Sequence, residues 1–208
     1  MEILAHRGLW KKVNEKNSLD VLKAAFDKGY GIETDIRDYK GKLVISHNIA
    51  DEKSADLEEL FAYYAGKKCD STLALNVKAD GIQDLLNELL LKYGIKNYFL
   101  FDMSVPEMVV NRKMNLNYYS RKSDVEKETV MIDDAIGVWV DRFYDDFLDL
   151  EYIKKVISLK KKVSIVSPEL HGFSYIEAWG KIRDEIGKSV YIQLCTDKPE
   201  EAEEFFHG

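Results

Sequence analysis

Short apolar runs alternate with amphipathic stretches along almost the whole chain. Several of the runs are apolar on both faces, as is typical of strands in a parallel sheet that helices cover on both sides. They predict strands at residues 2–5, 31–37 with a continuation at 43–46, 73–77, 98–102, 116–120, 136–140, 162–166 and 190–195.

The amphipathic stretches between these runs predict helices. In the first of them, residues 18–27, apolar side chains recur on one face; Asn17 or Ser18 is placed to cap its N-terminus, and Gly29 to end it. Further helices are predicted at 56–64, 82–93, 105–113, 150–160, 175–186 and 200–206, with a weaker pattern at 123–128.

This alternation predicts an α/β fold. About eight strands are each followed by a helix, the connections are short, and no flexible linker or repeat interrupts them. Such a pattern forms either an open doubly wound sheet or a closed (β/α)8 TIM barrel. We favour a single TIM-barrel domain over residues 1–208, a length near the lower limit for that fold.

Composition and charge narrow the class of protein. An apolar content of 46% argues against disorder, and only 3 Pro and 12 Gly exclude a collagenous chain. No apolar stretch approaches the ~18 residues of a spanning helix, and no signal peptide is visible. A net charge of −7 disfavours nucleic acid and anionic membranes as partners. The separated Cys69 and Cys195 indicate reduced thiols, so we expect a cytoplasmic protein; its oligomeric state stays open.

Three of the four histidines follow predicted strand ends. His6 comes after the first strand, His47 after the extension of the second and His171 after the seventh, whereas His207 lies in the terminal tail. In a TIM barrel the carboxyl ends of the strands surround the active site. These three imidazoles are therefore candidates for chemistry.

The second strand also carries two carboxylates on one face, Glu33 and Asp35. Two such groups repel each other and lose hydration inside a barrel unless a cation lies between them. A hard divalent ion with oxygen ligands, Mg²⁺ or Ca²⁺, meets that need. The alternative is an ion pair with Arg7, Arg37 or Lys78.

A series of motifs surrounds these residues: His6-Arg7-Gly8, Asn17-Ser18 before a helix with Ala25-Phe26 and Gly29, Glu33-x-Asp35, Gly41, and Val44-x-x-His47. Taken together, they resemble the glycerophosphodiester phosphodiesterase family, to which the sphingomyelinase D-like phosphodiesterases are related. The resemblance is strongest over residues 3–48 and continues weakly through Lys78 to residues 196–199.

The resemblance implies roles for several of these residues. His6 and His47 would be the general acid–base pair, with His6 as base and His47 as acid, although the sequence does not separate the two. Glu33 and Asp35 would bind the metal, and Arg7 would face phosphate oxygens together with Lys78. Cleaving a phosphodiester needs a cation on the phosphoryl oxygens, a base for the attacking hydroxyl and an acid for the leaving oxygen.

The chain departs from the family pattern at the end of the third strand. The family usually has Glu-x-Lys there, whereas this chain has Asn76-Val77-Lys78. Asn76 offers a carbonyl oxygen to the metal but no charge. Asp102, after the fourth strand, either supplies a carboxylate at this site or belongs to the N-cap region of the next helix.

A second departure lies after the second histidine. Asn48 stands where the family usually has Asp, and only residues 48–72 separate His47 from the third strand, without the usual inserted subdomain. The identity of the substrate is therefore not implied by the resemblance.

Further polar and aromatic groups follow later strands. Arg121, Trp139 and Glu169 are, with Asp102, candidates for binding phosphate or the rest of the substrate, and Asp141 ends the sixth strand. The alternatives are that Trp139 belongs to the core and that Glu169 pairs with Arg121.

We therefore predict a metal-dependent phosphodiesterase that acts on a small-molecule phosphodiester. The alternative is a binding module that kept a phosphate pocket while Asn76 and Asn48 removed metal binding and turnover; the presence of both His6 and His47 argues against it. An aldolase- or isomerase-like barrel ranks last, because Gly172 is the only glycine of the loop after the seventh strand.

Overall fold

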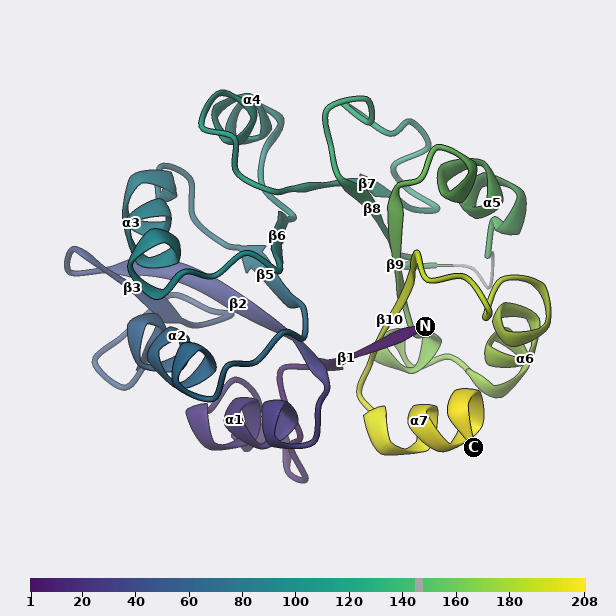
Figure 1. Ribbon diagram of the computed structural model, residues 1–208, viewed down its shortest axis with the longest axis horizontal. Helices are drawn as coiled ribbons and strands as arrows, with labels where there is room; N and C mark the ends of the chain where they lie inside the picture. Colours follow the sequence, from purple (N-terminus) through teal and green to yellow (C-terminus); the bar gives the residue numbers. More distant parts are fainter. Residues whose placement is uncertain (145–147) are drawn as a thin grey trace. The chain divides into compact units, whose positions relative to one another are not determined.

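The computed structural model describes residues 1–144 and 148–208, in which strands and helices alternate along the chain (Figure 1). The chain forms two compact units, one of Ala5–Tyr118 and one of Met1–Leu4 with Tyr119–Gly208. Strand β1 (Glu2–His6) is divided between them. Among the described residues, no helix is long and apolar enough to cross a membrane.

The unit Ala5–Tyr118 is built on a mixed sheet. Strand β5 pairs in parallel with β2 and β6, whereas β3 is antiparallel to β2 and to β4. Its elements after β1 are η1 (Val13–Glu15), α1 (Leu19–Asp27), β2 (Gly31–Tyr39), β3 (Lys42–Ile45), β4 (Ala55–Asp56), α2 (Leu57–Gly66), β5 (Leu73–Val77), α3 (Gln83–Tyr93), β6 (Tyr98–Phe101) and α4 (Val105–Lys113).

The other unit contains a parallel sheet in the order β7, β8, β9, β10. Tyr175, Phe205 and Phe206 pack their rings around the fully buried Trp179. The elements are β7 (Tyr119–Lys122), β8 (Gly137–Val140), α5 (Leu150–Ser158), β9 (Lys162–Val166), η2 (Pro168–His171), α6 (Ile176–Glu185), β10 (Ile192–Thr196) and α7 (Pro199–His207).

The burial of the strands agrees with their apolar pattern. Every residue of β5, β6, β8 and β10 is buried, and so are the first six residues of β2. Strands buried on both faces are what the nearly continuous apolar runs predicted. The polar side chains among them, including those of Glu33, Asp35 and Asn76, are therefore exceptions that need a reason.

The predicted continuation of the second strand is wrong, because residues 42–45 turn back on it instead. Lys40 and Gly41, with φ of 48° and 79°, join β2 to β3, and Ile36 lies opposite Ile45. Positive φ at both central residues favours a two-residue hairpin turn. The turn brings the segment before His47 back along β2, where the Ser46 N–H donates to the Asp35 carbonyl at 3.1 Å. The sequence could not show this turn, because a strand that continues straight on and a strand that folds back have the same apolar periodicity.

Two further local predictions are wrong. Residues 123–128 form no helix, because the Ser123 hydroxyl accepts hydrogen bonds from the Val125 and Glu126 amides and holds a turn. The strand predicted at 116–120 lies later, at Tyr119–Lys122, and Tyr118 makes an isolated bridge to Leu100.

Candidate active site

The turn after β1 places the first site residues. His6 ends the strand, and Arg7 and Gly8 take φ of 58° and 90°, while the Arg7 N–H donates to the Glu33 carbonyl at 2.9 Å. A Cβ on Gly8 would lie 2.7 Å from the carbonyl carbon of Val21, so only glycine fits here. The His-Arg-Gly sequence is thus explained by the backbone as well as by its polar groups.

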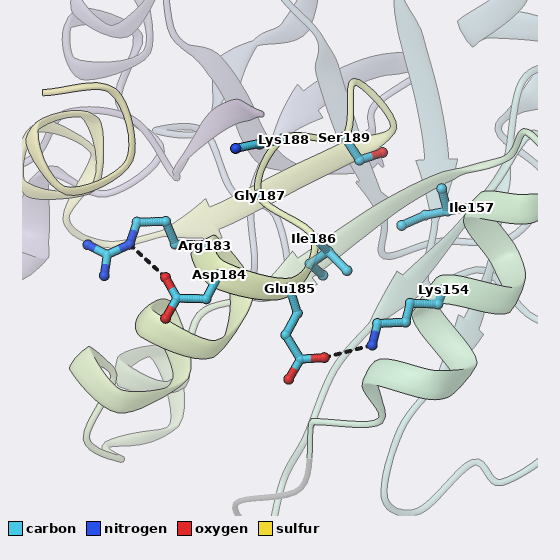
Figure 2. A pocket seen from close by; sticks show the side chains of 9 residues that line it. All are labelled: Lys154, Ile157, Arg183, Asp184, Glu185, Ile186, Gly187, Lys188 and Ser189. Carbon is cyan, nitrogen blue, oxygen red and sulfur yellow. Dashed lines mark hydrogen bonds and ion pairs between the residues drawn. The ribbon is translucent and has the colours of Figure 1, made fainter.

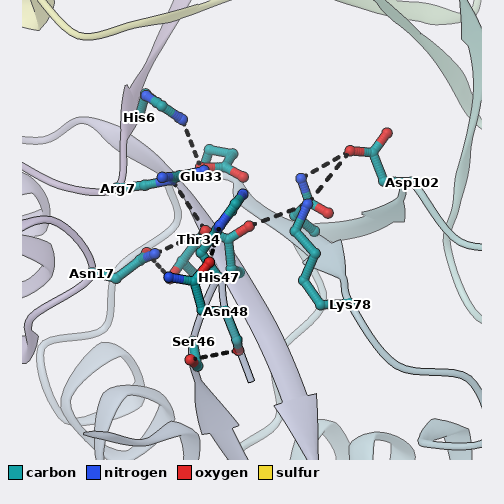
Figure 3. A network of polar contacts seen from close by, with 12 residues as sticks. His6, Arg7, Asn17, Glu33, Thr34, Ser46, His47, Asn48, Lys78 and Asp102 are labelled. Carbon is teal, nitrogen blue, oxygen red and sulfur yellow. Dashed lines mark hydrogen bonds and ion pairs between the residues drawn. The ribbon is translucent and has the colours of Figure 1, made fainter. Parts of the chain in front are cut away.

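Glu33 and Asp35 lie on β2 with exposed fractions of only 2% and 0%. Arg7 Nε lies 3.0 Å from Asp35 Oδ2, and Lys78 Nζ lies 3.4 Å from Asp35 Oδ1 (Figure 3). His6 Nε2 lies 3.7 Å from Glu33 Oε2. The ion pairs considered as an alternative to a metal site are therefore present for Asp35, formed with Arg7 and Lys78.

Glu33 is in a less compensated environment. Burial, followed by the charge of Asp35, raises the pKa of Glu33 well above its usual range, and the charges of Arg7 and Lys78 only partly oppose this. The ionised form of this carboxyl is therefore disfavoured unless further positive charge lies beside it. A bound cation would supply that charge.

Three buried oxygens on neighbouring strands have no hydrogen-bond partner: Glu33 Oε2, Asp35 Oδ1 and Asn76 Oδ1. Asp35 and Asn76 lie directly opposite each other in the β2–β5 register. Buried polar atoms without a partner are rare, and carboxylate and amide oxygens are ligands for Mg²⁺ and Ca²⁺. These residues therefore fit a divalent cation.

Asn76 contributes to that fit. Over residues 1–144 and 148–208, no three His, Cys, Asp or Glu side chains are arranged to hold a metal ion. In this unit the amide oxygen of Asn76 is available to a cation as a further ligand beside the two carboxylates.

Asp102 lies next to Asn76. Asn76 Nδ2 donates to Asp102 Oδ2 at 2.9 Å, and Lys78 Nζ lies 4.0 Å from the same oxygen. Asp102 does not cap the following helix; Ser104 does, since its hydroxyl accepts from the Glu107 N–H. The N-cap position thus belongs to Ser104, and a carboxylate supplied by Asp102 to a metal stays a prediction.

His47 follows the β3 hairpin strand and is exposed. Its Nδ1 lies 3.1 Å from Asn48 Oδ1. An amide oxygen only accepts, so this contact is a hydrogen bond in the tautomer of His47 that carries a proton on Nδ1, and Nε2 takes no part in it. Asn48 can thus orient the imidazole although it carries no charge.

Asn17, one of the two residues that the sequence offers as the cap of the first helix, contacts the carboxylate site instead. Its Nδ2 donates to Asp35 Oδ2 at 2.8 Å, and its Oδ1 accepts from the Thr34 hydroxyl at 2.8 Å (Figure 3). Ser18 occupies the N-cap position of α1 instead. The position of an Asn two residues before a helix does not distinguish these roles.

The remaining predicted site residues belong to the unit that contains Tyr119–Gly208. Arg121 forms an ion pair with Glu126 at 2.7 Å, a partner that the sequence did not suggest. Glu169 accepts from the hydroxyls of Ser167 and Thr196 and from the Asp197 N–H. A role for these side chains in binding substrate stays a prediction.

Two more predicted groups lie in this unit. Trp139 is only 4% exposed, as expected of a core residue. His171 Nε2 lies 2.8 Å from Asp141 Oδ1, and this hydrogen bond raises the pKa of His171.

A cavity of about 250 Å³ in the same unit contains none of the predicted site residues. It lies at the C-terminal end of α6, where Lys154 pairs with Glu185 at 2.7 Å and Arg183 with Asp184 at 3.2 Å (Figure 2). Lys154 and Arg183 are thus compensated by the cavity's own carboxylates, and we assign no ligand to this cavity.

Comparisons with known proteins bear on the fold. No protein-family profile matches the chain, and no curated protein matches it in sequence. Solved structures do match over its full length. A candidate glycerophosphodiester phosphodiesterase from Galdieria sulphuraria has a TM-score of 0.80 at 18% identity, covering 100% of this chain and 98% of that one.

Two further structures agree. The glycerophosphodiester phosphodiesterase of Agrobacterium tumefaciens has a TM-score of 0.73 at 14% identity, and both chains are covered completely. A phosphodiesterase of Oleispira antarctica, solved with the product sn-glycerol-3-phosphate, has a TM-score of 0.74 at 13% identity and covers 100% of this chain and 97% of that one.

These matches confirm the predicted fold. The chain has the α/β, TIM-barrel type of fold seen in glycerophosphodiester phosphodiesterases, and the resemblance drawn from its sequence motifs is confirmed at that level. At identities of 13–18% the likeness speaks for the fold alone, so function has to be argued from the site.

Proposed function

We propose that this protein is a metal-dependent phosphodiesterase that cleaves a glycerophosphodiester or a related small phosphodiester. The observation that carries the proposal is a convergence within the unit Ala5–Tyr118. His6 lies near Glu33 and the Arg7 guanidinium beside Asp35, and Lys78, which directly follows β5, also reaches Asp35. Binding a phosphate alone would not require buried carboxylates, which repel it.

The cation-binding residues in this proposal are Glu33, Asp35 and Asn76. When bound, Mg²⁺ or Ca²⁺ neutralises negative charge that develops on the phosphoryl oxygens. Arg7 and Lys78, which lie beside Asp35, are placed to add positive charge for the same oxygens.

The two histidines transfer protons. His6 Nε2 lies near the Glu33 carboxyl, which favours an imidazole that can take up a proton from the attacking hydroxyl. His47, with its Nδ1 on Asn48, can deliver a proton from Nε2 to the leaving oxygen. We keep the assignment of His6 as base and His47 as acid.

The substrate class draws support from a structural neighbour. The Oleispira antarctica phosphodiesterase was solved with sn-glycerol-3-phosphate as its product. A product of this kind is what cleavage of a glycerophosphodiester leaves, which makes small glycerophosphodiesters the first compounds to try.

The direct test is hydrolysis of bis(p-nitrophenyl) phosphate and a panel of glycerophosphodiesters, with Mg²⁺, Ca²⁺ or EDTA. We expect metal-dependent cleavage of a glycerophosphodiester, whose alkoxide leaving group needs a proton, to fall by about 100-fold or more in His47→Ala, whereas release of p-nitrophenolate, which leaves without a proton, should fall much less. His47 is exposed, so this variant should fold normally.

The matched control is His207→Ala, which removes an exposed imidazole that pairs only with Glu203 on its own helix among the contacts described. It should keep wild-type turnover. Full activity of His47→Ala on glycerophosphodiesters would contradict the mechanism. Phosphate binding without turnover in the wild-type chain would favour the alternative of a binding module.

A further inference from the structure

We propose that Asp102 is a positioning residue that turns the Asn76 amide so that its oxygen becomes the third ligand for the divalent cation. The inference rests on the metal dependence proposed above. It assigns to Asp102 an action through Asn76 and no direct contact with the ion.

The hydrogen bond between the two side chains decides the direction of the amide. Asn76 is 7% exposed, and its Nδ2 donates to Asp102 Oδ2 at 2.9 Å. An ionised carboxylate has only acceptors, so the reverse orientation would bring two acceptors together. The Asp102 carboxylate therefore keeps the amide nitrogen of Asn76 on its own side, so that Asn76 Oδ1 points away from Asp102.

The amide oxygen that points away from Asp102 is the atom of Asn76 that lacks a hydrogen-bond partner. Asn76 Oδ1 is buried without a hydrogen bond, as are Asp35 Oδ1 and Glu33 Oε2 on the neighbouring strand. Asp35 and Asn76 are register partners, so their side chains leave adjacent strands at the same level. A buried amide with one satisfied and one unsatisfied end is expected only where something else occupies the free end.

The backbone conformation at Asp102 supports a specific role for the position of its carboxylate. The residue directly follows β6, whose last residue Phe101 lies opposite Asn76, and its φ is 63°. Non-glycine residues rarely take this left-handed conformation, and Asp tolerates it better than most. The conformation turns the chain just where its carboxylate meets the Asn76 amide.

The expected effect is on metal affinity. A hydrogen bond from the amide nitrogen to a carboxylate fixes the ligand and draws electron density toward its oxygen. Removing partners of this kind lowers metal affinity by about 10–100-fold.

The test measures the dissociation constants of Mg²⁺, Ca²⁺ and Mn²⁺ by calorimetry on the full chain without substrate. Asp102→Gly accepts the positive φ and removes the carboxylate, and should weaken binding by about 10–100-fold. Asp102→Asn retains an oxygen that can accept from Asn76 Nδ2, and should weaken it only a few-fold. Equal losses in both variants would mean that charge alone matters and would overturn the proposal.

Asp80→Ala is the matched control. Asp80 is an exposed carboxylate on the segment after Lys78, and its Oδ2 accepts from the Ser104 hydroxyl. The control should bind metal as the wild type does. A loss as large as that of Asp102→Gly would point to general electrostatics and overturn the proposal.

A second background separates orientation from stability. Asn76→Asp replaces the amide with a carboxylate of the same shape, whose two oxygens are equivalent and need no orientation. In this background Asp102→Gly should tighten binding, because it removes a like charge. Weaker binding there, as in the wild-type background, would overturn the role assigned to Asp102.

These outcomes are distinct from those of the proposed function. If the wild-type chain binds no metal but hydrolyses phosphodiesters in EDTA, the present inference is overturned while phosphodiesterase activity stands. If the wild-type chain binds metal, and the affinities of Asp102→Asn and Asp102→Gly fall below it in that order, but the wild type hydrolyses nothing, the inference stands and the proposed activity fails.

Discussion

Three site residues, Arg7, Asn17 and Asp102, have positive φ of 58°, 64° and 63°. Each lies within two residues of a strand or helix, and each places a polar side chain near Asp35 or Asn76. Such conformations raise the energy of a non-glycine residue by roughly 1–3 kcal/mol and tend to occur at functional sites. At the residue scale, the unit therefore carries local strain where its polar groups converge.

The side chain of Asn17 stabilises this arrangement in a way that can be measured. Asn17→Gly keeps the positive φ but removes the hydrogen bonds to Asp35 and Thr34. We expect a loss of about 1–3 kcal/mol in the free energy of unfolding, since partly buried partners lose their bonds. Urea unfolding measures it.

Asn115→Gly provides the comparison for that variant. Asn115 is exposed and has a φ of 55°, so glycine there changes backbone freedom without removing a site contact. Asn115→Gly should leave the free energy of unfolding almost unchanged. Equal effects of the two substitutions would mean that the Asn17 side chain contributes nothing to stability.

The sequence predicted most of the residues at this scale and offered Arg7 and Lys78 as partners of the β2 carboxylates, but it did not show that both would pair with Asp35. His6, Arg7, Glu33, Asp35, Asn76, Lys78 and Asp102 were all predicted, and all lie in one unit. The hydrogen bonds of Asn17 to Asp35 and Thr34 were not predicted, because both partners lie on β2, far from Asn17 in the sequence. Local spacing reports which side chains share a face, but not which of several cations pairs with a carboxylate.

At the scale of elements, two turns bring the site together. The β1–α1 turn places His6 and Arg7 beside β2, and the hairpin from β2 to β3 returns the chain so that His47 follows a strand paired with β2. Glycine is needed in both turns, for different reasons. Gly8 has φ of 90°, and a Cβ there would lie 2.7 Å from the backbone of Val21, whereas Gly41 has φ of 79° and a Cβ there would meet no atom within 4 Å.

This difference predicts unequal effects of alanine. Gly41→Ala should destabilise the protein by about 1–2 kcal/mol through the left-handed backbone alone. Gly8→Ala should lose the same stability through its left-handed backbone and about 1–3 kcal/mol more, because its Cβ meets the backbone of α1. Thermal or urea unfolding of the two variants measures the difference; indistinguishable losses would show that α1 moves away without resistance.

At the scale of the whole molecule, the single domain predicted over residues 1–208 stays a prediction. The fold matches solved structures over the full chain, and contacts divide the chain into two compact units. Whether the units unfold together is a question of cooperativity that hydrogen exchange can answer.

Metal binding offers a way to measure this cooperativity. If a cation binds only the native state, at 100 times its dissociation constant it stabilises that state by about 2.7 kcal/mol. For a single domain, we expect the slowest amides of both units to gain this protection over the protein in EDTA, although Glu33, Asp35 and Asn76 lie in Ala5–Tyr118. A gain confined to Ala5–Tyr118 would contradict the single domain, and Asp35→Asn should remove the effect.

The sequence by itself determined the order of strands and helices, the fold class, and the side chains brought to the strand ends. These depend on local periodicity and on residue types, which a chain carries without its tertiary contacts. Only the tertiary structure decided that residues 42–45 return along β2, that Asn17 holds Asp35, and that Asp102 holds the amide of Asn76. Those outcomes depend on distances between residues far apart in the chain, and no periodic pattern encodes them.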